Sequence, residues 1–166
     1  KNLRIIRNKK NLGVAETSNI GIRAALGKYI IRVDADDYVN EEFLYQLHLF
    51  YRYNSQAFGV ACDYIYVNNN GTKLKRVSAK EVPVSCGIMY SKDKLVKNGL
   101  YKRSWRHREE EELRKRIGED YKIEYLSMPL YRYRMHKSNK TKQLKNIVAL
   151  ILAFLMSSNL TLLSSK

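Results

Sequence analysis

The sequence predicts an α/β fold with a mostly parallel sheet and flanking helices, and three observations predict it. Apolar runs rich in β-branched and aromatic residues, such as Tyr29–Val33, alternate with amphipathic runs of helical period, such as Phe43–Tyr53. The first of these strands ends in Asp34, Asp36 and Asp37, at the end where open α/β sheets bind ligands. At 166 residues, 45% of them hydrophobic, the chain is long enough for a domain with a sizeable core.

The first predicted elements form a compact β-α-β unit. Leu3–Arg7 is a short strand candidate, and turn-forming residues follow it up to Gly13. Val14–Leu26 contains good helix formers, and Gly27 stands where a left-handed residue would end that helix. Tyr29–Val33 is then a buried strand. Such a unit calls for a parallel sheet with a right-handed crossover.

Helices and strands continue to alternate along the rest of the chain. Asn40 is a helix N-cap candidate, and its helix runs to about Tyr53. The later predicted elements are strands 59–67 and 73–77 around a turn at 68–71, a strand over 84–90, a short helix from Ser91, a turn at 98–99, a charged helix over 108–117 closed by Gly118, and short strands over 123–126 and 130–135.

The last segment, residues 141–166, differs in kind from the domain formed by residues 1–140. It contains ten consecutive apolar residues, Ile147–Met156, preceded by several lysines. That run is well short of the ~20 residues that span a bilayer. A helix that is apolar on all sides is buried in protein or touches lipid. The basic flank favours an interfacial helix on an anionic membrane surface, and a helix that packs on protein is the alternative.

The charge and the cysteines limit the classes of partner and compartment. The formal charge is +15, from 31 basic and 16 acidic residues, which implies an anionic partner. A nucleic-acid-binding module is the main alternative from another class, although the sequence has no zinc-ligand spacing, GxxG clamp or aromatic RNA-binding motif. Cys62 and Cys86 show no metal or redox spacing, so we expect buried, unpaired thiols in a reducing compartment.

The acidic turn is the strongest chemical signal. Carboxylates packed together at a strand end repel one another unless a cation neutralises them. Hard oxygen ligands on a short turn suit Mg²⁺ or Mn²⁺, and these metals usually hold a substrate's phosphates as well. The turn therefore predicts a divalent metal site, and a solvated turn that caps the next helix is the alternative.

Several linked motifs resemble the family 2 glycosyltransferases of the GT-A fold. The motifs are, in order, residues 11–15, 18–22, 25–30, 33–37, 85–90, 98–101, 108–113 and 131–136. The resemblance spans residue 2 to about residue 140. Such domains begin with two strands that bind the nucleobase, and neither is found here. The resemblance therefore implies a GT-A (Rossmann-like) domain that is N-terminally truncated and followed by a C-terminal apolar helix. An inactive fragment kept as an interaction domain is a further alternative.

The resemblance also implies a reaction and the residues that bind the donor. The reaction is an inverting, metal-dependent transfer of a sugar from a nucleotide-sugar donor to a glycan or lipid-linked acceptor, as in surface polysaccharide synthesis. Asp36 would bind Mn²⁺ or Mg²⁺, Asp34 would face the donor's ribose or complete the metal shell, and His136 would reach the metal or the diphosphate. Asn19 matches a donor-side motif, with packing as its favoured alternative role. The expected location is cytoplasmic, peripheral on the inner face of the cell membrane where the tail contacts lipid.

The acidic run Glu109–Glu112 resembles the motif that supplies the catalytic base of this family. Alignment on Leu113 favours Glu110, which stands where the family has Asp. Glu is one methylene longer, and catalysis is sensitive to displacements of ~1 Å, so Glu109 remains the other candidate. The base would take the proton of the acceptor hydroxyl. The alternative is a solvated helix face, because Arg114 lies at i+4 from Glu110.

Overall fold

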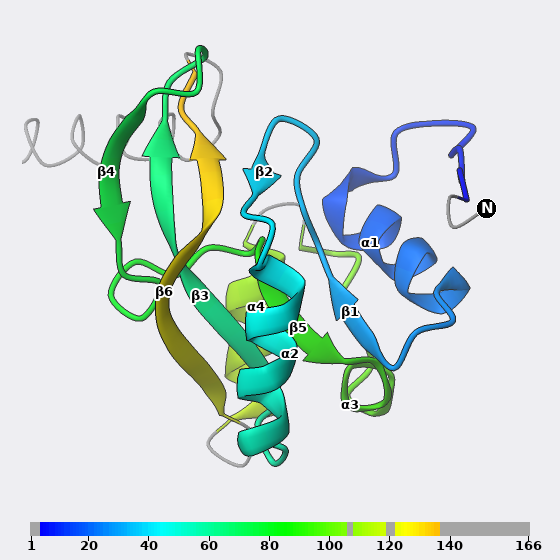
Figure 1. The fold of residues 1–166 in the computed structure, drawn as a ribbon. Helices are drawn as coiled ribbons and strands as arrows, with labels where there is room; N and C mark the ends of the chain where they lie inside the picture. Colours follow the sequence, from blue (N-terminus) through cyan, green and yellow to red (C-terminus); the bar gives the residue numbers. More distant parts are fainter. Residues whose placement is uncertain (1–3, 106–107, 119–121, 137–166) are drawn as a thin grey trace, which may run out of the picture.

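A computed structural model describes residues 4–105, 108–118 and 122–136 (Figure 1). In chain order the elements are α1 (Gly13–Ala24), β1 (Tyr29–Ile31), β2 (Tyr38–Val39), α2 (Phe43–Tyr53), β3 (Gly59–Val67), β4 (Lys73–Val77), β5 (Ile88–Ser91), α3 (Lys92–Lys97), α4 (Glu109–Ile117) and β6 (Ile123–Arg134). Figure 1 shows α2 across the near face of the sheet and α4 behind it. The predicted α/β class is confirmed.

The sheet is mixed, so the prediction of a mostly parallel sheet is wrong. Its strand order is β1-β5-β3-β6-β2, and β4 also pairs with β3. Among the described strands, β3 and β6 form the one parallel pair, and the other four pairs are antiparallel. A tight turn leads from β3 into β4, and short connections of this kind produce antiparallel neighbours, whereas parallel neighbours need long crossovers.

The predicted β-α-β unit is not found. Residues 4–7 lie outside any strand, and β1 pairs antiparallel with β5 rather than parallel with an earlier strand. Ile5 is 73% exposed, so its apolar side chain is not part of the core. The helix ends at Ala24, three residues before Gly27. Local sequence predicted a strand at 3–7, but none of the described strands lies beside residues 4–7 to supply the hydrogen bonds that a strand needs.

The later elements follow the sequence closely, with one merger and two shifted starts. The strand predicted over 84–90 begins only at Ile88, and the helix predicted from Asn40 begins at Phe43 with Glu42 as its N-cap. The predicted β3–β4 hairpin is confirmed at both strands. The two strands predicted over 123–126 and 130–135 form a single strand, β6. Its register against β3 shifts between Leu126 and Pro129, where Pro129 has no N–H to donate. The bulge lets β6 continue to the acidic turn, where Tyr131 is fully buried.

The core lies between α2, the sheet and α4. α2 buries Phe43, Leu47 and Tyr51, which repeat at i and i+4 and so form one stripe. Behind the sheet, α4 buries Leu113 and Ile117. Cys62 and Cys86 are free and buried, as predicted.

The apolar segment predicted as a helix over 147–156 lies outside the described residues. Among the helices that the structure describes, none has the length and apolar character needed to cross a bilayer.

Candidate active site

The acidic turn follows directly on β1 and is closed by its own backbone. β1 ends at Ile31, and the N–H of Asp37 donates to the carbonyl of Asp34 at 3.0 Å. β2 begins at Tyr38 and pairs with β6, so the turn is held between two strands. The three carboxylates of the turn have different partners, which gives each a different environment.

Asp37 is anchored to β6 through Tyr131. The Tyr131 hydroxyl accepts the N–H of Asp34 at 3.1 Å and donates to Oδ2 of Asp37 at 2.7 Å. Oδ1 of Asp37 accepts the backbone N–H of Arg134 at 2.8 Å. Burial raises the pKa of Asp37, although the Arg134 and Tyr131 hydrogen bonds oppose the increase. Both of its oxygens are engaged with β6, so this carboxylate supports the turn.

A group of candidate metal ligands forms beside this anchor. Oxygens of Asp34 and Asp37 and the Sγ of Cys86 all lie within 4.8 Å of one another. Burial raises the pKa of the Cys86 thiol to about 12. Sulfur is also a soft ligand, whereas Mg²⁺ and Mn²⁺ prefer oxygen. The carboxylates remain, and they are the oxygen ligands that Mg²⁺ and Mn²⁺ prefer. Because both oxygens of Asp37 are engaged with β6, Asp34 is the carboxylate of this group that is open to a hard divalent cation, and Asp36 and His136 are not members of the group.

Asp36 and His136, two of the predicted metal ligands, contact each other. Nε2 of His136 lies 2.7 Å from Oδ2 of Asp36. The hydrogen bond from His136 lowers the pKa of Asp36, and its burial opposes this. Arg134 donates from Nε to the Asp36 carbonyl at 2.7 Å, which joins the end of β6 to the turn. The pair thus forms an exposed extension of the acidic turn, and its metal role stays a prediction.

Arg32 connects the acidic turn to α4. Its Nε lies 3.1 Å from Oδ1 of Asp34, and its Nη1 donates to Oε1 of Glu109 at 2.9 Å. Its Nη2 donates to the hydroxyl of Ser85. Glu109 is only 4% exposed, so this carboxylate points inward from the first turn of the helix. The solvated helix face that sequence left open as an alternative is wrong for Glu109.

Glu110 is buried on a different side of the same helix turn. Tyr90 donates to its Oε1, and Tyr101 donates to its Oε2 at 3.2 Å. Arg114 lies 3.4 Å from Oε1, which confirms the i+4 contact predicted from sequence. Desolvation raises the pKa of Glu110, against the opposing effects of Tyr90, Arg114 and Tyr101. Both oxygens of Glu110 therefore have partners in the protein.

Asn19 is a buried packing residue. It is 2% exposed, its Nδ2 donates to the carbonyl of Tyr101 at 2.8 Å, and its Oδ1 accepts the Tyr101 N–H at 3.0 Å. This pairing fixes α1 to the loop that also holds the Tyr101 phenol against Glu110. The packing role favoured from the sequence has direct contacts, whereas donor binding by Asn19 stays a prediction.

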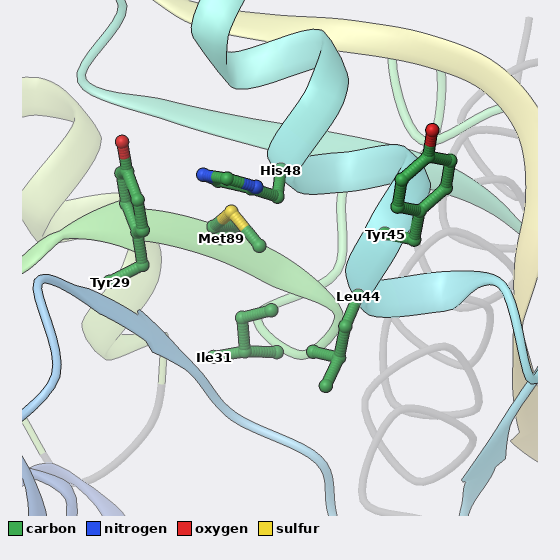
Figure 2. Close-up of a pocket in the computed structure, with 6 residues that line it drawn as sticks. All are labelled: Tyr29, Ile31, Leu44, Tyr45, His48 and Met89. Atoms are coloured by element: carbon green, nitrogen blue, oxygen red, sulfur yellow. The ribbon is translucent and has the colours of Figure 1, made fainter.

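Two hollows flank β1. One, of about 420 Å³, lies between α1 and the acidic turn and is lined by Asn11, Gly13, Val14, Thr17, Ser18, Arg32, Val33, Asp34 and Ala35. The other, of about 450 Å³, is mainly apolar and is lined by Tyr29, Ile31, Leu44, Tyr45, His48 and Met89, as Figure 2 shows. The first contains Arg32 and Asp34, and we take it as the candidate substrate cleft.

Comparison with known proteins gives the family of this chain. Residues 1–139 match the profile described as Glycosyl transferase family 2.

The chain belongs to glycosyl transferase family 2. Among solved structures, it is similar to the crystal structure of S. aureus TarS 1-349, with a TM-score of 0.59 and 20% sequence identity. The match covers 74% of this chain and 40% of that chain, and at this identity it shows the fold alone. No curated protein matches the sequence.

Family 2 enzymes transfer glycosyl groups and often use divalent metals, in agreement with a carboxylate site at the end of β1. Sequence reasoning identified the carboxylates but missed Arg32 and Tyr131. The signal for Arg32 was its position as the one charged residue within the apolar run 29–33. Tyr131 carried no such signal, because its partners lie more than 90 residues away in the chain.

Proposed function

We propose that this family 2 domain transfers a sugar from a nucleoside-diphosphate sugar to an acceptor hydroxyl. The observation that carries the proposal is the bridge made by Arg32, which lies 3.1 Å from Asp34 and 2.9 Å from Glu109. A metal-side carboxylate and a base-side carboxylate therefore share one guanidinium beside the cleft. This supports a single site in which donor and acceptor meet.

Mn²⁺ or Mg²⁺ is the proposed cofactor, held by Asp34 and Asp36 with His136 in support. The side chain of Asp34 is 42% exposed and that of Asp36 is 46% exposed, so both are accessible to an ion from solvent. Asp37, whose oxygens bind β6, keeps the turn in place. When bound, the divalent cation would offset the negative charge on the departing nucleoside diphosphate.

The proposed base is on the first turn of α4. Alignment favoured Glu110, but two phenols and Arg114 already surround that carboxylate. Arg32 is the one described partner of Glu109, through Oε1, which leaves Oε2 able to accept a proton. Contact with the cleft residue Arg32 further supports Glu109, and Glu110 remains the alternative.

The reaction is a single displacement at the anomeric carbon. The base takes the proton of the acceptor hydroxyl while the acceptor oxygen forms its bond to the anomeric carbon. The bond from that carbon to the diphosphate oxygen breaks, and its electron pair leaves with the nucleoside diphosphate. Attack opposite to the leaving group inverts the configuration. A glycan or lipid-linked acceptor, as in surface polysaccharide synthesis, is the proposed second substrate.

A donor panel tests this proposal. The full chain is titrated with nucleoside diphosphates and nucleoside-diphosphate sugars, with and without Mn²⁺, and release of nucleoside diphosphate is measured. We expect Mn²⁺-dependent binding and slow release with at least one donor. Failure of every nucleoside diphosphate to bind in the presence of Mn²⁺ would refute the proposal.

Variants then test the assigned roles. Asp36→Ala should abolish the Mn²⁺ dependence without loss of fold, because this side chain is exposed. Glu109→Gln should keep donor binding and lose at least 100-fold in transfer, a typical contribution for a general base. Glu111→Gln is the matched control, because Glu111 is exposed on the same helix and its ion-pair partner among the described residues is Arg108 at 3.4 Å. Unchanged transfer in Asp36→Ala would exclude the metal role.

A further inference from the structure

Arg32 is a partly buried cation within an otherwise apolar strand-like run. It follows β1 directly, and its side chain is 21% exposed. Its backbone is fixed as well, because the N–H of Gly87 donates to the Arg32 carbonyl at 2.9 Å. A charged side chain in such a position is costly unless it has partners of opposite charge or hydrogen-bond acceptors. Nη1 and Nη2 donate to Glu109 and Ser85, whereas Nε lies 3.1 Å from Oδ1 of Asp34 in an ion pair without hydrogen-bond geometry.

The three partners of the guanidinium lie on separate segments of the chain. Asp34 belongs to the acidic turn, Ser85 to the segment before β5, and Glu109 to the first turn of α4. A guanidinium presents its N–H groups in a rigid, planar fork, so it fixes the angles between its acceptors as well as their distances. The ammonium group of a lysine is a single charged centre on a flexible side chain, so it does not fix its partners in one plane.

From these contacts we propose that Arg32 is a positioning residue that sets both the placement of Glu109 and the strength of cation binding at Asp34. The inference rests on the proposed function, since it assigns Arg32 a role in that same site. The fork holds Oε1 of Glu109, so this carboxylate has one orientation beside the cleft residue Arg32. Loss of the fork releases Glu109, and small displacements of a catalytic group cost large factors in rate.

The same cation acts on metal binding through its charge. A divalent ion at Asp34 is repelled by a guanidinium 3.1 Å from that carboxylate. Arg32 therefore weakens binding of the bare ion. The diphosphate of a donor brings negative charge that offsets this repulsion, so firm metal binding requires the donor.

Two substitutions separate the two effects. Arg32→Gln removes both charge and fork, whereas Arg32→Lys keeps the charge and loses the fork. We expect Arg32→Gln to bind Mn²⁺ alone about tenfold more tightly than the wild type, and Arg32→Lys to bind it within about threefold of the wild type. Both variants should lose roughly 100-fold in kcat with little change in KM for the donor.

The control variant is Arg76→Gln. Arg76 pairs with Asp63 at 2.7 Å on the β3–β4 hairpin, and its hydrogen bonds within the described part of the chain go to Asp63 and Ser127 rather than to the acidic turn or α4. It should change neither Mn²⁺ affinity nor kcat, even if it lowers the melting temperature. Binding is measured by calorimetry with Mn²⁺ alone and again with Mn²⁺ and the nucleoside diphosphate that the wild type binds.

The outcomes distinguish this inference from the proposed function. If the wild type binds no nucleoside diphosphate with Mn²⁺, the proposed function fails and the role of Arg32 fails with it. If the wild type binds Mn²⁺ and nucleotide but Arg32→Gln has wild-type Mn²⁺ affinity and wild-type kcat, only the inference is overturned. Tighter Mn²⁺ binding in Arg32→Gln, without the same gain in Arg32→Lys, supports it even before an acceptor is known.

Discussion

The phenol of Tyr131 contacts both ends of the acidic turn, and its removal tests how far that turn depends on β6. Tyr131→Phe keeps the buried ring but removes the hydroxyl that accepts from Asp34 and donates to Asp37. Because the lost hydrogen bond involves a carboxylate, we expect the free energy of unfolding to fall by about 1–2 kcal/mol. The looser turn should also bind Mn²⁺ with nucleotide several-fold more weakly.

Chemical denaturation and calorimetry measure these two effects. The control is Tyr125→Phe, which loses a hydroxyl of β6 that accepts from Arg114 of α4 at 2.9 Å and not from the acidic turn. That variant should lose stability but keep the Mn²⁺ affinity of the wild type. Equal Mn²⁺ affinity in Tyr131→Phe and the wild type would show that the turn holds its shape without β6.

The buried carboxyl of Glu110 makes the stability of the domain depend on pH. Burial raises its pKa, so the folded protein retains this proton to higher pH than the unfolded chain. Its contribution therefore favours folding below the unfolded-state value of about 4.3 and is lost as the pH rises through the folded-state value. Glu110→Gln cannot ionise, so the variant does not lose this contribution to stability as the pH rises. We expect the melting temperature of the variant, relative to the wild type, to increase from pH 4.5 to pH 7.5.

Glu111→Gln serves as the control, because this neighbouring carboxylate is exposed and its substitution should leave a melting curve parallel to that of the wild type. The opposite shift at Asp36, whose pKa is lowered, is present in all three proteins and cancels in the comparison. Parallel profiles for Glu110→Gln and the wild type would contradict the prediction.

At the level of elements, the approach of the segment before β5 to Tyr131 on β6 depends on Gly87. This residue has a φ of +72°, and a Cβ placed on it would lie 2.8 Å from the ring of Tyr131. Gly87→Ala is therefore strained in its backbone and collides with the side chain that anchors the acidic turn. We expect a loss of about 2–3 kcal/mol in unfolding free energy together with reduced Mn²⁺ binding.

Gly118→Ala separates backbone strain from the collision. Gly118 also has a positive φ, of +61°, but a Cβ there meets no atom within 4 Å. This variant should lose about 1 kcal/mol and keep Mn²⁺ binding. If the two variants are equally stable and bind Mn²⁺ equally, the Gly87–Tyr131 contact is not a constraint on the site.

The elements also show where prediction from sequence stops. The β3–β4 hairpin and α4 could be placed because their signals are local: a turn between alternating strands, and a charged run closed by Gly118. The partners of β1 could not, because β5 is more than 50 residues away and no local signal sets its direction. The residues of the site also fall into a locally predictable group and a group that depends on distant contacts. Its aspartates are visible in sequence, whereas the contact of Arg32 with Glu109 crosses 77 residues.

At the scale of the whole molecule, the charge of +15 and the apolar tail lead to the last prediction. Residues 137–145 contain four lysines and no acidic residue, directly before the apolar run Ile147–Met156. Each lysine near an anionic surface contributes about 1 kcal/mol of attraction, so this flank favours anionic over neutral membranes. We expect the chain to float with vesicles that contain anionic lipid at about 0.1 M salt and to be released when the salt is raised to about 0.5 M.

A charge variant makes this test specific to the tail. Replacing Lys140 and Lys142 with Gln removes about 2 kcal/mol of attraction, which corresponds to roughly 30-fold weaker partition into anionic vesicles. Replacing Lys73 and Lys75, which are exposed on β4, removes the same charge elsewhere and serves as the control. Equal recovery with neutral and anionic vesicles, or none with either, would exclude an electrostatic anchor. If both double variants lose the same amount of binding to anionic vesicles, the attraction comes from the overall charge. Only a loss of vesicle binding confined to the variant of Lys140 and Lys142 supports a membrane contact beside the basic flank.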